Sequence, residues 1–134
     1  MQKAFEIKSQ IENLRVIEKA IDDISAELGL AEEAYGKIMV SSLEAVNNAI
    51  IHGNKGNEDK NVRICFSLSQ KDMNVSVEDE GEGFAPGKVP DPTQPENIEN
   101  LRGRGVFLMT HLSDKIEFNN KGNIVVMTFK DITT

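Results

Sequence analysis

The stretch EAVNNAIIHGN, from Glu44 to Asn54, decides how the rest of this chain is interpreted. The residues around it predict a helix from Ala34 to His52 that is apolar over most of its circumference. Glu44 and Asn48 lie between two apolar arcs of that helix, roughly 40 degrees apart around its axis, so a carboxylate and an amide share one notch. A metal ion with a reactive hydroxyl nearby would compensate the carboxylate for its lost hydration. The alternative is a solvated strip, which such a pair most often is.

Length and composition predict one folded domain covering residues 1–134. Charged residues make up 28% of the chain and hydrophobic residues 39%, as in globular proteins. No apolar run reaches the roughly 18 residues of a membrane helix, and no signal pattern opens the chain, so we expect a cytoplasmic protein with no membrane association. The net charge is -7 and the basic residues are scattered, which argues against direct nucleic-acid binding. The single cysteine, Cys65, is expected to be a buried or half-buried strand residue.

Hydrophobic periodicity predicts the order of the remaining elements. The expected elements are a strand at 3–8, helices at 11–28 and 34–52, a hairpin at 62–68 and 73–77, a helix at 106–112, and strands at 114–119 and 124–130. This order indicates an α+β fold, a two-layer α/β sandwich in which about three helices cover one face of a mainly antiparallel sheet.

The second informative stretch is EDEGEGF, residues 78–84. Asp79 continues the inward phase of Val77, so its carboxylate is expected on the core side of the sheet, where it needs a donor. The spacing does not match a calcium-binding loop, and a plain acidic turn is the simplest interpretation of Glu80 and Glu82.

The third stretch follows a proline-rich segment, residues 85–102, which we interpret as a lid loop. Gly103 and Gly105 are expected directly before an apolar helix, where glycines let the backbone approach an anion. Taken alone, the two glycines are weak evidence for an anion site, and the alternative is a flexible loop end.

Together, EAVNNAIIHGN, EDEGEGF and LRGRGVFLM resemble the three ATP-binding boxes of the GHKL superfamily, which has the histidine-kinase-like ATPase fold. Across residues 5–130 the chain looks most like the bacterial anti-sigma factor serine/threonine-protein kinases. The resemblance implies that Glu44 is the general base, that Asn48 holds Mg²⁺ and that Asp79 accepts a hydrogen bond from the adenine amino group. The ATP-binding residues that it implies are Asn48, Asp79, Gly81, Gly83, Gly103 and Gly105.

Two points of the match stay open. His52 is either part of the site or a residue that faces the dipole at the end of its helix. Members of the family often have a Gly-Thr pair before the last strand, whereas this chain has Gly122 and Asn123, which leaves a hydroxyl near the adenine in doubt.

The resemblance implies an ATP- and Mg²⁺-dependent serine kinase that phosphorylates an anti-anti-sigma (STAS-type) protein, sequesters a sigma factor and forms a homodimer. One alternative is a non-catalytic ATP-binding module that switches between partners. A second is the catalytic domain of a histidine kinase, although no histidine-bearing helix precedes the first box. A third is a gyrase-type ATPase, for which the chain lacks a transducer domain.

Overall fold

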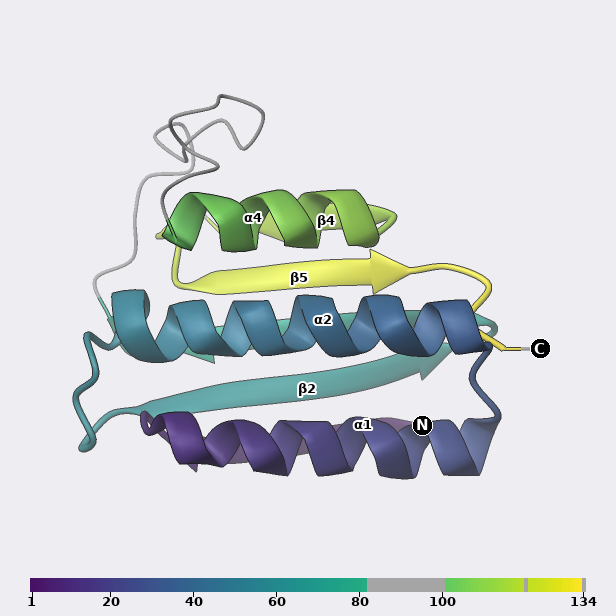
Figure 1. Ribbon diagram of the computed structural model, residues 1–134, viewed down its shortest axis with the longest axis horizontal. Coiled ribbons are helices and arrows are strands. Elements are labelled where there is room, and N and C mark those ends of the chain that lie inside the picture. The colour runs from purple at the N-terminus through teal and green to yellow at the C-terminus, as the bar shows by residue number, and fades with distance from the viewer. Residues whose placement is uncertain (82–100, 120, 134) are drawn as a thin grey trace.

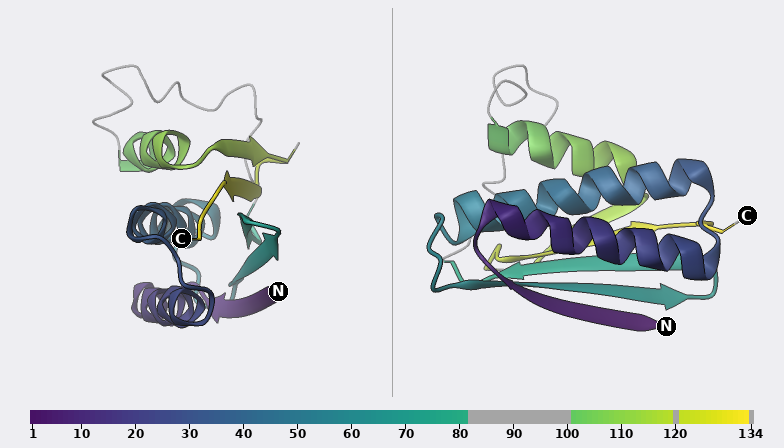
Figure 2. Two further views of the ribbon diagram at one scale, coloured as in Figure 1. Left: turned by 90° about the vertical axis from the view of Figure 1, so that its right-hand side faces the viewer. Right: turned by 60° about the horizontal axis from the view of Figure 1, so that its bottom comes forward.

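The computed structural model describes residues 1–81, 101–119 and 121–133. Within these residues, helices cover one face of a five-stranded sheet of order β1-β2-β3-β5-β4 (Figures 1 and 2). The strands are β1 (Gln2–Lys8), β2 (Asn61–Ser69), β3 (Asp72–Asp79), β4 (Lys115–Phe118) and β5 (Ile124–Phe129). Every neighbouring pair of these strands is antiparallel. The predicted α+β two-layer fold is confirmed.

The helical layer consists of three α-helices and two short turns in the described residues. They are η1 (Ile11–Asn13), α1 (Leu14–Leu28), α2 (Glu32–Asn48), the π-helical turn η2 (Ala49–Gly53) and α4 (Leu101–Leu112). α2 lies between α1 and α4 and packs against both (Figure 1). This position explains why α2 is apolar over most of its circumference, because it faces the sheet and two neighbouring helices.

Alternating side chains fix the register of the sheet against the helices. Val62 and Val77 are almost completely buried, and the β2–β3 hairpin pairs Val62 with Asp79 at its open end. Gln70 turns the hairpin with a left-handed φ of 58°. Asp79 therefore lies at the end of the central strand β3, beside the η2 turn that follows α2.

A glycine ends α1, and a hydrogen bond joins α1 to α2. Its apolar face buries Ile17, Ile21 and Ile24, and Gly29 ends it in the left-handed conformation with φ 69°. The Tyr35 hydroxyl of α2 donates a hydrogen bond to Asp22 of α1, and this bond raises the pKa of the Tyr35 phenol.

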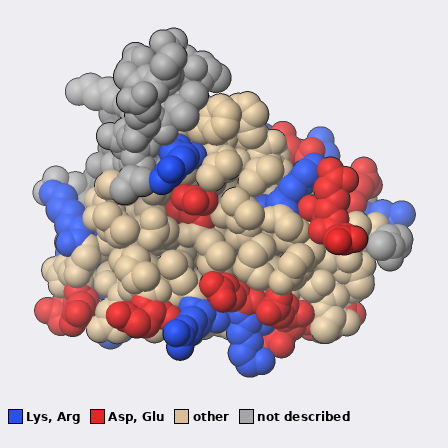
Figure 3. Space-filling model, in the orientation of Figure 1, with Lys and Arg blue, Asp and Glu red and all other residues tan. Residues whose placement is uncertain are grey.

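Exposed charges contribute little to holding these layers together. On the helical face, acidic and basic side chains gather mostly over α1 and near the ends of the molecule (Figure 3). Two of the ion pairs, Lys19 with Asp23 and Lys37 with Glu33, join residues one turn apart on α1 and α2. Such exposed pairs each contribute roughly 0.3–0.5 kcal/mol, so apolar packing carries the stability. None of the helices in the described ranges is long and apolar enough to cross a membrane.

The predicted boundaries of two helices are wrong. The second helix starts at Glu32 instead of Ala34, and its last turn, from Ala49 to Gly53, is π-helical. α4 starts at Leu101, so Gly103 and Gly105 lie inside the helix and not before it, and the predicted lid ends before residue 101. Tertiary packing overrides the low helix propensity of glycine here. Gly83 and residues 85–100 of the predicted lid lie outside the described residues.

Candidate functional site

The notch on α2 faces the backbone of α4. Glu44 and Asn48 are half-buried, and Gly105 lies directly against them. A Cβ atom added at Gly105 would lie 2.9 Å from Asn48 Nδ2 and 3.1 Å from Glu44 Oε2. A residue without a side chain is therefore what allows α4 to approach this polar pair so closely.

A second close approach joins η2 to the end of β3. A Cβ atom added at Gly53 would lie 2.2 Å from Asp79 Oδ2, so the half-buried Asp79 carboxylate sits against the last residue of η2. As its strand phase predicts, this carboxylate lies on the helical side of the sheet. Its Oδ1 accepts a hydrogen bond from the Gly81 N–H at 2.8 Å. A Cβ atom at Gly81 would lie only 1.9 Å from the Gly53 carbonyl oxygen, so two glycines are needed where these segments meet.

A pocket opens between the helices and the sheet at this end of the molecule. Its lining includes Asn48, Gly53, Val77, Asp79, Val106 and Asn123. The walls combine apolar side chains with a few converging polar groups, which is the usual lining of a small-molecule site. Asn48 belongs both to this pocket and to the notch that holds Glu44 and Gly105, so the two features are continuous.

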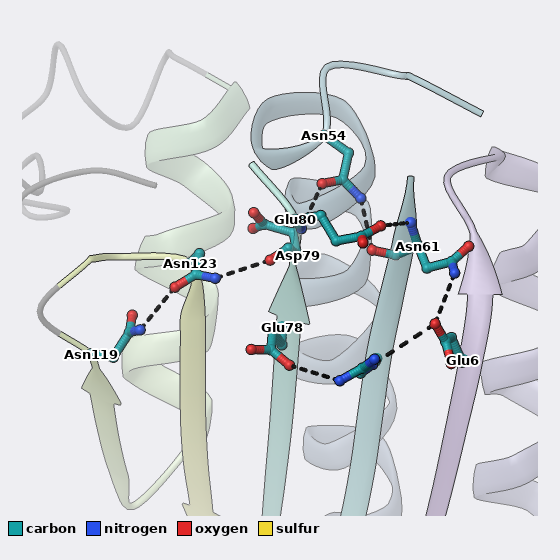
Figure 4. A network of polar contacts seen from close by, with 9 residues as sticks. Glu6, Asn54, Asn61, Glu78, Asp79, Glu80, Asn119 and Asn123 are labelled. Atoms are coloured by element: carbon teal, nitrogen blue, oxygen red, sulfur yellow. Dashed lines mark hydrogen bonds and ion pairs between the residues drawn. The ribbon is translucent and has the colours of Figure 1, made fainter. Parts of the chain in front are cut away.

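The turn before β5 contacts Asp79 on the side opposite to η2. The Asp79 N–H donates to the Asn123 carbonyl oxygen at 3.0 Å, and Asn123 Nδ2 donates to the Asp79 carbonyl oxygen at 3.0 Å (Figure 4). Asn119 Nδ2 in turn donates to Asn123 Oδ1 at 2.8 Å. At the position where the GHKL families often have threonine, this chain therefore has the Asn123 side-chain amide. Hydrogen bonds to Asp79 and from Asn119 hold that amide in place.

The polar groups beside the pocket suit a magnesium ion that is held together with phosphates. Mg²⁺ prefers oxygen ligands and usually takes only one or two from protein, with phosphates and water completing its shell. Asn48 offers an amide oxygen, with the Glu44 carboxylate beside it. No group of three His, Cys, Asp or Glu residues that could hold a metal occurs in the described part of the chain. The donor set fits a shared metal better than an all-protein cage.

The structure thus brings Glu44, Asn48, Asp79, Gly81 and Gly105 to one end of the molecule. Gly103 is buried two residues before Gly105 in α4 and is not part of the pocket lining. His52 is half-buried within η2.

Gly53 and Asn54 end the first stretch of sequence, but no role was predicted for either of them. Such a pair is an ordinary signal for a helix end, and the partners of both residues are distant in sequence: Asp79 for Gly53, Ser9 and Glu80 for Asn54.

The chain belongs to the histidine kinase-like ATPase domain family, whose model matches residues 7–129. It is 27% identical over 132 residues to the serine-protein kinase RsbW of Oceanobacillus iheyensis, covering 94% of this chain and 84% of that protein. It is 30% identical over 136 residues to the anti-sigma F factor of Clostridium perfringens, covering 97% of this chain and 95% of that protein. The predicted GHKL resemblance is confirmed.

A solved structure shows the same fold. The crystal structure of the RsbU and RsbW domains of Rv1364c from Mycobacterium tuberculosis matches with a TM-score of 0.71 at 14% identity. The match covers 99% of this chain and 33% of that one, so this chain corresponds to about one third of the length of that protein.

Proposed function

We propose that this protein is a cytoplasmic ATP-dependent serine kinase and anti-sigma factor. It phosphorylates an anti-anti-sigma protein of the STAS type and, when not engaged with that protein, sequesters a sigma factor. The observation that carries this proposal is the convergence of Glu44, Asn48 and Gly105 with the Asp79 pocket. The relatives named serine-protein kinase and anti-sigma F factor support it.

Each residue has a role that its position suits. Asp79 accepts a hydrogen bond from the adenine amino group, while Val77 and Val106 pack against the ring. Asn48 would hold Mg²⁺ together with the phosphates, and the ion would supply positive charge against the charge that develops on them. Glu44 takes the proton from the partner's serine hydroxyl. The serine oxygen bonds to the terminal phosphorus of ATP, and the bond between that phosphorus and the ADP oxygen breaks.

The proposal is tested by incubating the protein with Mg²⁺, γ-labelled ATP and a STAS-type protein from the same cell. We expect label on a serine of the STAS protein, stable in acid. Retained nucleotide binding with no transfer would instead support the non-catalytic module, and acid-labile label would support a histidine kinase. Capture of a sigma factor in the presence of ADP tests the second activity separately.

Gly105→Ala should separate stability from nucleotide binding. Alanine favours a helix over glycine by roughly 1 kcal/mol, so the melting temperature should hold or rise. The added Cβ must displace the Asn48 and Glu44 side chains, so MgADP affinity should fall at least about tenfold, equivalent to 1.4 kcal/mol. Thermal unfolding and calorimetry measure the two effects.

The matched control is Gly36→Ala in α2. A Cβ atom at Gly36 meets nothing within 4 Å, so this variant should gain stability and bind MgADP normally. Normal MgADP binding by Gly105→Ala would show that α4 is not part of the site.

A further inference from the structure

Asn54, the residue after Gly53, is polar yet only 1% exposed. Its Nδ2 donates to Ser9 Oγ at 2.7 Å and to the Asn61 carbonyl oxygen at 3.0 Å. Its Oδ1 accepts from the Glu80 N–H at 2.8 Å (Figure 4). One buried side chain thus connects the ends of β1 and β3 with the start of β2.

The orientation of this amide is determined by its partners. The Asn61 carbonyl can only accept and the Glu80 N–H can only donate, so the reversed amide would face like groups at both positions. Ser9 completes the arrangement, since its hydroxyl donates to the Lys60 carbonyl oxygen at 2.8 Å while it accepts from Asn54. Ser9 is itself only 3% exposed, so Asn54 is anchored to a buried frame.

The bond to Glu80 acts on the peptide group that follows Asp79. The N–H of that peptide group donates to Asn54, and its carbonyl oxygen, which belongs to Asp79, accepts from Asn123 Nδ2 at 3.0 Å. Two asparagines on opposite sides therefore fix the peptide plane from which the Asp79 side chain projects. The orientation of a short side chain such as aspartate follows the orientation of its backbone.

We propose that Asn54 is a positioning residue for purine recognition, which holds the Asp79–Glu80 peptide so that the Asp79 carboxylate meets the exocyclic amino group of adenine. This inference rests on the proposed nucleotide-binding function. It adds a residue that acts through Asp79 and not by touching the nucleotide.

The test compares MgADP with MgIDP, whose base carries a carbonyl oxygen in place of the adenine amino group. In the wild-type chain the Asp79 carboxylate should favour ADP, because it accepts from the amino group and repels the carbonyl. Asn54→Asp keeps the acceptor for the Glu80 N–H but places an oxygen against the Asn61 carbonyl oxygen. This repulsion weakens the hold on the Asp79–Glu80 peptide. We expect the ratio of the IDP and ADP dissociation constants, measured by calorimetry, to fall at least about fivefold.

The ratio distinguishes positioning from a purely structural role. Partial unfolding weakens the binding of both nucleotides equally and leaves the ratio unchanged. Asn57→Asp is the matched control, because it makes the same charge change at an exposed site in the same loop and keeps the acceptor for the Asp59 N–H. It should retain the wild-type ratio.

Ser9→Ala is the second variant, which removes one acceptor of Asn54 without changing the loop. It should lower the ratio by a smaller factor, and it decides the question if Asn54→Asp does not fold. A wild-type ratio in the folded Asn54→Asp chain overturns the role of Asn54 but not the adenine site. If Asn54→Asp is unfolded, a wild-type ratio in Ser9→Ala has the same meaning. A wild-type chain that binds neither nucleotide, or both equally, overturns the proposed adenine site itself.

Discussion

Glu44→Ala is expected to abolish detectable phosphoryl transfer while MgADP affinity stays within about tenfold of wild type. General-base catalysis contributes roughly 10²- to 10⁴-fold to a rate, and this variant removes the proposed proton acceptor. The proposed adenine contact is made by Asp79 of β3 and not by α2, so it should stay intact and binding should persist. Single-turnover transfer of label to the STAS protein measures the rate, and calorimetry measures the affinity.

Two further variants make this result specific. Glu44→Gln keeps the shape beside Gly105 but cannot act as a base, so it should be as inactive as Glu44→Ala. Glu33→Ala removes an exposed carboxylate from the first turn of the same helix and should transfer phosphate normally. An unchanged transfer rate in Glu44→Ala would reject Glu44 as the base.

Gly53→Ala should cause the largest loss of nucleotide affinity among the glycine variants. The new Cβ would lie 2.2 Å from Asp79 Oδ2, so the Asp79 side chain must rotate away from the pocket. A hydrogen bond to a charged group contributes roughly 1.5–3 kcal/mol, which corresponds to a loss of about 10- to 150-fold in MgADP affinity. Calorimetry measures the loss, and thermal unfolding shows whether the chain remains folded.

Asp79→Asn provides the comparison without a steric change. It should lose affinity by a similar factor, since it removes the charged acceptor while it keeps the size of the side chain. Wild-type MgADP affinity in a folded Gly53→Ala chain would show that the Asp79 carboxylate does not contact the base.

Periodicity predicted the fold because strands and helices repeat their apolar residues with different periods. The alternation through Val77 also placed the Asp79 carboxylate on the helical side of the sheet, where the structure has it. These predictions succeed because burial of one face determines the register of a strand.

The remaining features depend on contacts between distant residues. Gly105 looks like a loop residue because glycine is a poor helix former, yet it lies inside α4, where it packs against Asn48. Asn54 reads as a turn residue, and only the folded chain brings it to Glu80, 26 positions away. Local sequence propensity cannot predict either contact.

The direct test of a nucleotide site in this chain is the titration of MgADP into the wild-type protein, followed by calorimetry. We expect a saturable 1:1 binding heat that requires Mg²⁺ for full affinity and is lost or strongly weakened in Asp79→Asn. Absence of any binding heat in the folded wild-type chain, or equal binding by Asp79→Asn, would contradict a nucleotide site formed by α2, β3 and α4.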